Sequence, residues 1–331
     1  MVDEARQRIR RIVPRARLSC ISPRTALHAS LSALTRTLIG KLMLKLITWN
    51  IQSARSPDGG ADIGGVLASL DRCFDLSADA DVLADVLCLQ EVACGFPARD
   101  GSIIGDQFAE LSRRLPGWEA VRAYAVDTLA PDGGRRRLGS MVFSRHPILQ
   151  VLRHSLPWPA DPEVPSIPRI ALEVTLDTPL GLLRLLNAHL EYFSELQRLA
   201  QAEALRALQR EACAHARRPR QGGSADSPFL ALPRPAPAVL LGDFNMLPGS
   251  HCHQALLAPF DDDTPPWRDA WPLVHPGRAH APTVGLHDPA GHPFTFDYAF
   301  VGADLATRVR AVRVAGAACG SDHQPLLLEL G

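Results

Sequence analysis

The chain has 331 residues, with 35 basic and 35 acidic side chains, a formal net charge of zero and 46% hydrophobic residues. This length and apolar content suffice for a large two-layered β fold. No apolar run reaches the ~18 residues that a membrane-spanning helix needs, because Arg36, Lys41 and Lys45 interrupt the stretch from Leu31 to Leu46. We therefore expect no stable membrane insertion.

The seven cysteines are scattered along the chain, and no two of them form a Cys-x-x-Cys pair. An odd number without regular spacing is typical of reduced thiols and not of a disulfide framework. The cysteines therefore favour a cytoplasmic location.

The zero net charge conceals an asymmetry between two parts of the chain. Residues 1–42 carry nine basic and two acidic side chains, net +7, and residues 43–331 carry net −7. A net-acidic region exerts no general attraction on nucleic acid, whose non-specific affinity comes mostly from phosphate neutralisation. Three interpretations of residues 1–42 compete: translation starts at Met43, the segment is a disordered basic extension, or it is an Arg-rich targeting peptide.

From Met43 onward the pattern alternates between strands and helices. Met43 to Asn50 has the β-branched and aromatic content of an opening strand, and Val86 to Leu89 is a short apolar run typical of a buried strand. Ser140 to Arg145 predicts a further strand. Ile170 to Leu176 and Leu182 to Leu186 predict a hairpin around a Pro-Leu-Gly turn.

The pattern then predicts a long helix, an insertion and another strand. Ser194 to Ala214 has an apolar stripe near 3.6-residue spacing, with Ser194 as the N-cap. Residues 215–237 are rich in Arg, Pro, Gly and Ser and predict a loop insertion. Ala238 to Leu241 predicts a strand that leads into Gly242 and Asp243.

Six short polar motifs occur in a fixed order along residues 43–331. They are Thr48-Trp49-Asn50-Ile51-Gln52, Leu89-Gln90-Glu91-Val92, Asn187-Ala188-His189-Leu190, Leu241-Gly242-Asp243-Phe244-Asn245, Phe296-Asp297-Tyr298 and Ser321-Asp322-His323-Gln324-Pro325. Each motif alone is typical of a turn or a strand end. Together and in this order, they resemble the endonuclease/exonuclease/phosphatase superfamily of deoxyribonuclease-I-like, metal-dependent phosphoesterases.

The resemblance implies an α/β (α+β) fold for residues 43–331, a four-layered sandwich of two packed mixed β-sheets flanked by helices. It places the active site at one end of the sandwich. Several of the polar residues follow apolar strand-like runs, and strand ends can bring distant residues together on the rim of a sheet.

The resemblance also implies the chemistry and the residues that perform it. A divalent cation, Mg²⁺ or Mn²⁺, suits carboxylate and amide ligands, and the residues on the metal side would be Asn50, Glu91 and Asp322. Asp243 and Asn245 would position the attacking water and contact the scissile phosphate. His323 would be the general base or would stabilise the phosphoryl transition state, with Asp297 fixing its tautomer.

Two departures from the abasic-site endonucleases indicate the branch of the superfamily. His189 stands where those enzymes carry a Tyr, and no Lys follows two residues after Glu91. The chain is similar instead to the deoxyribonuclease, sphingomyelinase and phosphatase branches, in which a His at this place can donate a proton to a phosphoryl or leaving oxygen. Arg169 either reaches the substrate phosphate or forms a structural salt bridge, and Tyr192, Arg198 and Gln201 either line the rim or pack.

These features predict a divalent-metal-dependent hydrolase of phosphodiester bonds that acts by in-line attack of water. Its substrate would be a nucleic acid, a nucleotide or a phospholipid headgroup. The alternatives are a small-molecule or lipid phosphomonoesterase of the same fold and a catalytically inactive scaffold or binding module. The sequence indicates no protein partner.

Overall fold

The computed structural model describes residues 43–56, 58–74, 84–222, 227–287, 291–316 and 318–331. They belong to one compact unit that spans Met43–Gly331. The predictions for residues 1–42 lie outside the described residues.

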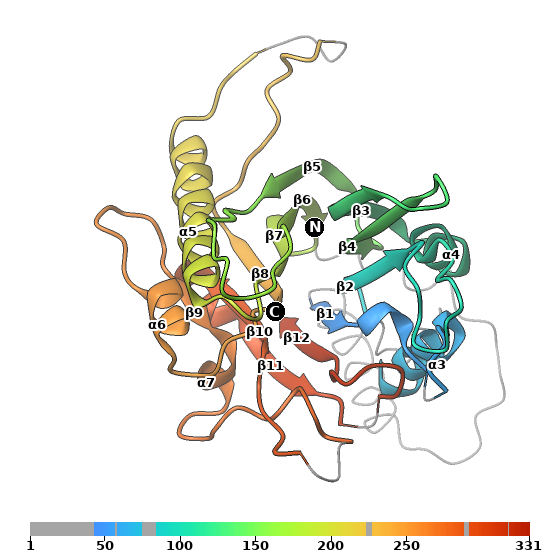
Figure 1. Cartoon of the computed structure of the whole chain (residues 1–331). Coiled ribbons are helices and arrows are strands. Elements are labelled where there is room, and N and C mark those ends of the chain that lie inside the picture. Colours follow the sequence, from blue (N-terminus) through green and yellow to red (C-terminus); the bar gives the residue numbers. More distant parts are fainter. Residues whose placement is uncertain (1–42, 57, 75–83, 223–226, 288–290, 317) are drawn as a thin grey trace, which may run out of the picture. The chain divides into compact units, whose positions relative to one another are not determined.

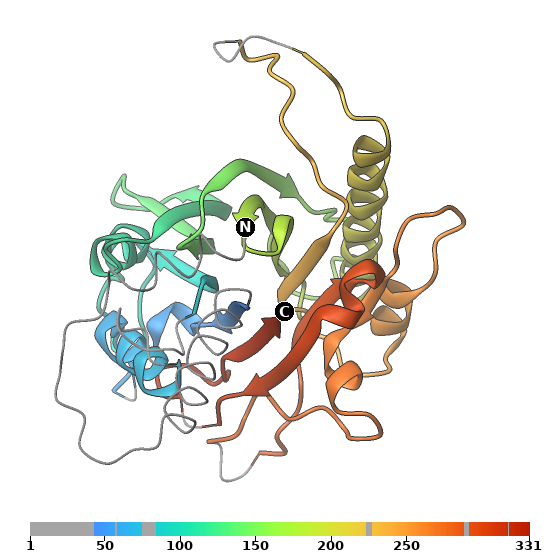
Figure 2. The ribbon, with the colours of Figure 1, turned by 180° about the vertical axis from the view of Figure 1, so that it is seen from behind.

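Two six-stranded β-sheets form the centre of this unit (Figures 1 and 2). The first sheet has the strand order β11-β12-β1-β2-β4-β3, and the second has the order β5-β6-β7-β8-β10-β9. The strands of the first sheet are β1 Leu44–Asn50, β2 Val86–Cys94, β3 Glu119–Leu129, β4 Arg135–Ser144, β11 Val309–Val314 and β12 Leu326–Leu330. Those of the second are β5 Ile148–Ser155, β6 Ile170–Thr178, β7 Gly181–His189, β8 Ala238–Asp243, β9 Trp267–Asp269 and β10 Asp297–Gly302.

Each sheet is mixed, and each has one parallel pair of neighbours near its middle. In the first sheet β1 runs parallel to β2, and Asn50 pairs with Gln90. In the second sheet β7 runs parallel to β8, and His189 pairs with Asp243. Because the carboxyl ends of parallel strands lie at the same edge of a sheet, each pair delivers its terminal polar residues to one edge.

The alternation of side chains along the strands builds three buried clusters. Leu46 of β1 and Leu241 of β8 belong to the core between the two sheets. Ile47 and Trp49 point the other way, and they pack in the core beneath the helices that flank the first sheet. Since both faces of β1 are buried, its sequence is a nearly continuous apolar run and not an alternating one.

Helices cover the outer face of each sheet and complete four layers. The helices α3 (Ile63–Phe74) and α4 (Gln107–Arg114) share a core with β1 and β2. The helices α5 (Glu195–Arg217) and α6 (His251–Leu257) share one with β7, β8 and β10. The remaining helical segments are α7 (Ala270–Val274), η1 (Gln52–Ala54) and η2 (Ala303–Arg308). The predicted fold class, two mixed sheets flanked by helices, is confirmed. No helix among the described residues is long and apolar enough to span a bilayer.

The helix α5 begins where the sequence predicted and ends later. The hydroxyl of Ser194 accepts a hydrogen bond from the backbone N–H of Gln197, which is the predicted N-cap. The helix continues through Arg217, so the loop begins at residue 218 and not at 215. The basic side chain of Arg217 is favourable in the last turn of the helix. A proline disfavours helical conformation in the residue before it, so Pro219 accounts for the end of the helix near Arg218.

A buried ion pair connects the second sheet to α5. Nε of Arg184 donates to Glu173 over 2.8 Å, and its Nη1 donates to Gln209 of α5 over 3.0 Å. His154 contacts the other carboxylate oxygen of Glu173 at 3.0 Å. Burial alone would raise the pKa of Glu173, but the hydrogen bond from His154 and the charge of Arg184 outweigh it and lower that pKa to about 2.

We expect Glu173→Gln to destabilise the protein by about 3–5 kcal/mol, because the change leaves Arg184 buried without its counter-charge. The Glu173 pKa is lowered from 4.5 to about 2 in the fold, so its stabilisation, about 3 kcal/mol, is complete above about pH 4.5 and is lost as pH falls towards 2. Urea unfolding across this range measures both effects. The control is Glu110→Gln in the exposed pair with Arg114, which we expect to cost less than about 0.5 kcal/mol. A loss below about 1 kcal/mol in Glu173→Gln would contradict this description.

Candidate active site

The carboxylate of Asp243 is the meeting point of residues from both sheets. Its Oδ2 accepts a hydrogen bond of 2.9 Å from Nδ2 of Asn50, which ends β1 in the first sheet. The same oxygen lies 3.4 Å from Nε2 of His189 and 3.7 Å from Nε2 of His323. Three residues that are distant in the sequence therefore converge on one buried oxygen of a fourth.

Strand register explains this convergence. Asp243 ends β8, with His189 opposite it on β7 and Asp297 opposite it on β10. At Gly242 the backbone has φ +146°, and a Cβ there would lie 1.8 Å from the carbonyl oxygen of Ala188. Only glycine therefore allows β8 to lie against β7 immediately before the Asp243 carboxylate.

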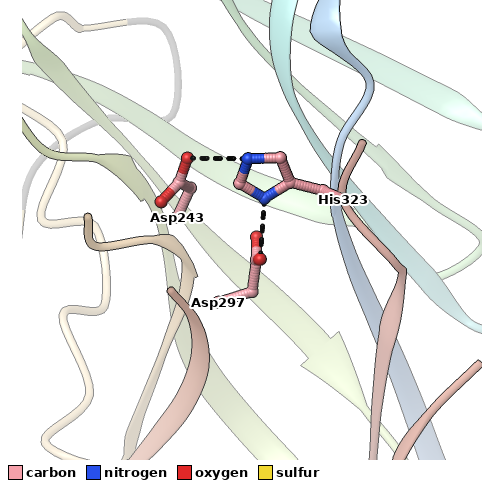
Figure 3. A group of neighbouring side chains, drawn as sticks. All are labelled: Asp243, Asp297 and His323. Carbon is pink, nitrogen blue, oxygen red and sulfur yellow. Dashed lines mark hydrogen bonds and ion pairs between the residues drawn. The ribbon is translucent and has the colours of Figure 1, made fainter. Parts of the chain in front are cut away.

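Asp297 and His323 form a hydrogen-bonded dyad beside Asp243 (Figure 3). Nδ1 of His323 lies 2.8 Å from Oδ2 of Asp297, so the other ring nitrogen faces Asp243. The backbone of His323 is held as well, because Nε1 of Trp49 donates to its carbonyl oxygen and its N–H donates to Ser321. The dyad thus sits in the orientation that the resemblance implied.

Burial and charge determine the ionisation of these groups. Burial raises the pKa of Asp243 to about 7. Burial alone would lower the pKa of His323, but the carboxylates of Asp297 and Asp243 outweigh it and raise the pKa to about 10. Burial and the neighbouring Arg169 hold the pKa of His189 well below its usual range. At neutral pH His323 is thus an imidazolium and His189 is neutral.

The first sheet contributes Glu91 and Asn50. Glu91 has φ +53° at the point where the register between β2 and β4 shifts, and its side chain is 29% exposed. Nδ2 of Asn50 donates to both Glu91 and Asp243, while its Oδ1 accepts from the N–H of Gln52. In this structure Asn50 therefore presents its NH₂ group to the two carboxylates.

Asp322 lies beside this group and is half exposed. Nε2 of Gln52 donates to Asp322 Oδ2 over 2.6 Å, and Asp322 Oδ1 lies 3.9 Å from Nε2 of His323. Gln52 belongs to η1, whose residues Gln52, Ser53 and Ala54 all have positive φ. Left-handed turns of non-glycine residues are costly and concentrate at functional sites.

Asn245 and Arg169 complete the set of predicted site residues. Asn245 is buried with φ +49°, and its side chain donates to the carbonyl oxygen of Leu190. Arg169 forms an ion pair with Glu191 at 3.1 Å, and its Nη1 lies 3.0 Å from Nε2 of His189. Of the two interpretations of Arg169, the salt bridge is present, and the same guanidinium also contacts a predicted catalytic residue.

Two groups of side chains are candidates for a divalent cation. Asp243, Asp297 and His323 offer ligand atoms that all lie within 4.8 Å of one another. However, Oδ2 of Asp297 and Nδ1 of His323 are already joined by their hydrogen bond. Glu91 and Asp322 are 29% and 50% exposed and offer carboxylate oxygens, which hard Mg²⁺ and Mn²⁺ prefer. The donor chemistry therefore fits a divalent cation on the Glu91 side.

The structure identifies supporting residues whose roles the sequence did not predict. Nε2 of Gln90 donates to Oδ1 of Asn187 over 2.7 Å, which joins the first sheet to the second. Glu191 holds Arg169, and Gln52 holds Asp322. Gln90 and Asn187 both belong to the polar motifs of the sequence. An amide side chain within an apolar strand-like run was the feature that could have identified them.

The residues that follow His189 divide between the rim and the interior. Tyr192 is 51% exposed and lines an open pocket that also contacts Asn245. Gln201 is buried and accepts a hydrogen bond from the N–H of Glu191. Arg198 donates to the carbonyl oxygens of Glu191 and Tyr192.

Comparison with known proteins agrees with this architecture. Residues 47–323 match the model of the endonuclease/exonuclease/phosphatase family. A solved member of that family from Beutenbergia cavernae is similar over 87% of this chain and 71% of its own, with 24% identity and a TM-score of 0.57. No curated protein matches this chain.

Two further solved structures share the fold at lower identity. A mannosyl-6-phosphatase from Bacteroides thetaiotaomicron matches over 87% of this chain and 99% of its own, with 19% identity and a TM-score of 0.60. A 3′ phosphatase from Neisseria, bound to a product DNA hairpin, matches over 87% of this chain and 99% of its own, with 20% identity and a TM-score of 0.54.

The chain therefore belongs to the endonuclease/exonuclease/phosphatase family. It is a hydrolase that acts on phosphate esters.

We expect Glu91→Gly to be more stable than Glu91→Ala by about 1 kcal/mol, because a non-glycine residue pays a steric cost at positive φ. Both variants lack the carboxylate, so the difference between their free energies of unfolding reports the cost of the backbone conformation alone. Urea unfolding measures this difference. The control is the same pair of changes at Glu110 inside α4, where glycine should be the less stable by about 1 kcal/mol. Equal stabilities of the two variants at position 91 would contradict the strained geometry.

Proposed function

We propose that this protein is a Mg²⁺- or Mn²⁺-dependent phosphodiesterase that hydrolyses its substrate by in-line attack of water on phosphorus. The observation that carries the proposal is the convergence of Asn50, His189 and His323 on the Asp243 carboxylate. Acidic, neutral and cationic side chains thus lie next to one another, which supports a shared site for one substrate phosphate.

The carboxylates of Glu91 and Asp322 would hold the divalent cation next to Asn50. When bound, such a cation neutralises charge on the phosphoryl oxygens and lowers the pKa of a coordinated water. Asn50 as a direct ligand stays a prediction, and its present hydrogen bonds connect the Glu91 and Asp243 carboxylates.

The remaining polar side chains would divide the proton chemistry. Asp243 and Asn245 orient the attacking water, and a pKa near 7 suits Asp243 to accept a proton at neutral pH. His323, held as an imidazolium by Asp297, stabilises the negative charge that develops on the phosphoryl group. Because its pKa is held below the usual range, His189 is neutral, so its ring N–H would donate a hydrogen bond to a phosphoryl or leaving oxygen.

Charge and space support a diester. Among the site residues described above, the positive charges are Arg169, which already pairs with Glu191, Arg198, which donates to two backbone carbonyl oxygens, and His323. A diester carries one negative charge, whereas a monoester carries close to two, so the diester needs less compensation. The open pocket beside Asn245 also provides room for a second esterified group.

A phosphomonoesterase is the second candidate, because two of the similar structures are described as phosphatases. Within the family, His189 and the absence of a Lys two residues after Glu91 support the histidine-containing branch over the abasic-site endonucleases. A catalytically inactive binding module is the remaining alternative, and the presence of every expected polar residue argues against it.

We expect the full chain to hydrolyse bis-p-nitrophenyl phosphate faster than p-nitrophenyl phosphate with Mg²⁺ or Mn²⁺, and to lose this activity with EDTA. The variants Glu91→Ala, Asp243→Ala and His323→Ala should each lose ~10²-fold or more in turnover, because each removes a charged group from the reacting centre. Plasmid DNA is tested in parallel.

The control is His215→Ala, which removes a 60% exposed histidine on α5 and should leave turnover unchanged. Full activity in the three site variants would refute the proposed site. Faster hydrolysis of the monoester would select the phosphatase, and folded protein that neither binds metal nor turns over any substrate would select the binding module.

A further inference from the structure

An open pocket of about 460 Å³ lies directly beside the proposed catalytic residues. Its walls are Tyr192 and Phe193 from the loop after His189, Met246 and Leu247 after Asn245, and Phe296 immediately before Asp297. Asn245 itself belongs to the lining. A volume of this size is in the range of small-molecule sites, and a group bound here would be continuous with a phosphate held at Asn245.

The pocket presents unusually exposed aromatic rings. Tyr192 and Phe193 are 51% and 56% exposed, and their ring centroids are 4.7 Å apart in an edge-to-face contact. Phe296 lies 6.1 Å from Tyr192, and Leu247 is 52% exposed. Single exposed apolar residues are normal on protein surfaces, but a contiguous group beside a reactive site indicates a ligand-binding surface.

Hydrogen bonds hold the Tyr192–Phe193 loop in place before any ligand arrives. The Glu191 carboxylate accepts from the N–H of Phe193 and from Arg169. Nη1 of Arg198 donates to the carbonyl oxygens of Glu191 and Tyr192, each over 2.8 Å. A preorganised ring loses little freedom when a ligand stacks on it, which strengthens binding.

The charge of the pocket limits what it can bind. The lining residues that carry a charge at neutral pH are Glu195 and Arg198. Arg198 is already used by the two backbone carbonyls, and Glu195 is negative and largely exposed. The described residues that line the pocket therefore do not include the group of cations that a second phosphate would need.

We infer that this pocket takes a flat, uncharged aromatic group of the phosphate-ester substrate, a nucleobase or an aryl ring, which stacks on the Tyr192 ring and meets the perpendicular Phe193 ring edge to face. The inference rests on the proposed function, since the phosphate of the same substrate lies at Asn245 and Asp243. Stacking of a base on an aromatic side chain is sequence-tolerant and strong enough to raise affinity about 10-fold per ring.

Titration calorimetry with Mg²⁺ tests this inference without relying on turnover. The full chain carries His323→Ala in every sample to suppress hydrolysis, and the probes are adenosine 5′-monophosphate, phenyl phosphate, ribose 5-phosphate and octyl phosphate. We expect the two aromatic probes to bind about 10-fold more tightly than ribose 5-phosphate. Adenosine monophosphate binding more tightly than phenyl phosphate indicates a nucleobase, and equal binding indicates any aryl ring.

Variants at Tyr192 test whether the preference for aromatic probes arises in this pocket. Tyr192→Ala should remove most of the preference while leaving the affinity for ribose 5-phosphate unchanged, and Tyr192→Phe should retain it. The matched control is Phe229→Ala, which removes a 71% exposed phenylalanine from the segment after α5 and should change nothing.

Three results would overturn the inference: equal affinity for all probes, tightest binding of octyl phosphate, or a preference that survives Tyr192→Ala. These outcomes are separate from the test of the proposed function. Metal-dependent hydrolysis without an aromatic preference would reject the pocket alone, and an aromatic preference without hydrolysis would reject the catalytic proposal alone.

Discussion

The active site depends on a hydrogen-bonded join between the two sheets. Gln90 of the first sheet and Asn187 of the second are fully buried and bond to each other, and Asn187 also donates to the carbonyl oxygens of Leu89 and Met141. Separating the sheets would leave these amides unsatisfied, at about 1–3 kcal/mol for each group. Glu91 directly follows Gln90, and His189 lies two residues after Asn187. This contact therefore fixes the spacing between Glu91, the proposed metal ligand, and His189, the proposed catalytic histidine.

Close to this contact between the sheets, the chain contains strained backbone conformations and buried carboxylates, which destabilise the fold locally. Glu91 and Asn245 have left-handed backbone conformations, and Asp243 and Asp297 are carboxylates with almost no exposure. Strain and buried charge of this kind concentrate where a protein must hold reactive groups in one geometry. The buried Asp297 maintains the charge of His323, and the close approach at Gly242 brings Asp243 beside His189. The left-handed backbone and the buried carboxylates therefore occur together at the candidate site, where they hold the polar side chains in one geometry.

Much of this could be predicted from the sequence because it depends on local patterns. The apolar runs that end at Asn50 and Asp243 indicated buried strands with polar ends, and Ser194 indicated the start of α5. Features that depend on tertiary contacts could not be predicted. The partners of Gln90 and Arg169 come from other strands or loops, and the left-handed turn at Gln52 has no glycine to signal it. The predicted end of α5 at Ala214 was also too early, because the Arg- and Pro-rich composition of the next residues indicated a loop. The helix in fact continues to Arg217.

The position of the metal ion tests the proposed active site most directly. A crystal of the full chain grown with Mn²⁺ and measured at the manganese absorption edge would locate the ion by its anomalous signal. We expect a peak at the carboxylates of Glu91 and Asp322, with the hydrogen bond between Asp297 and His323 intact. A peak held by Asp243, Asp297 and His323 would contradict it, because those residues would then be ligands and could not perform the proton chemistry assigned to them.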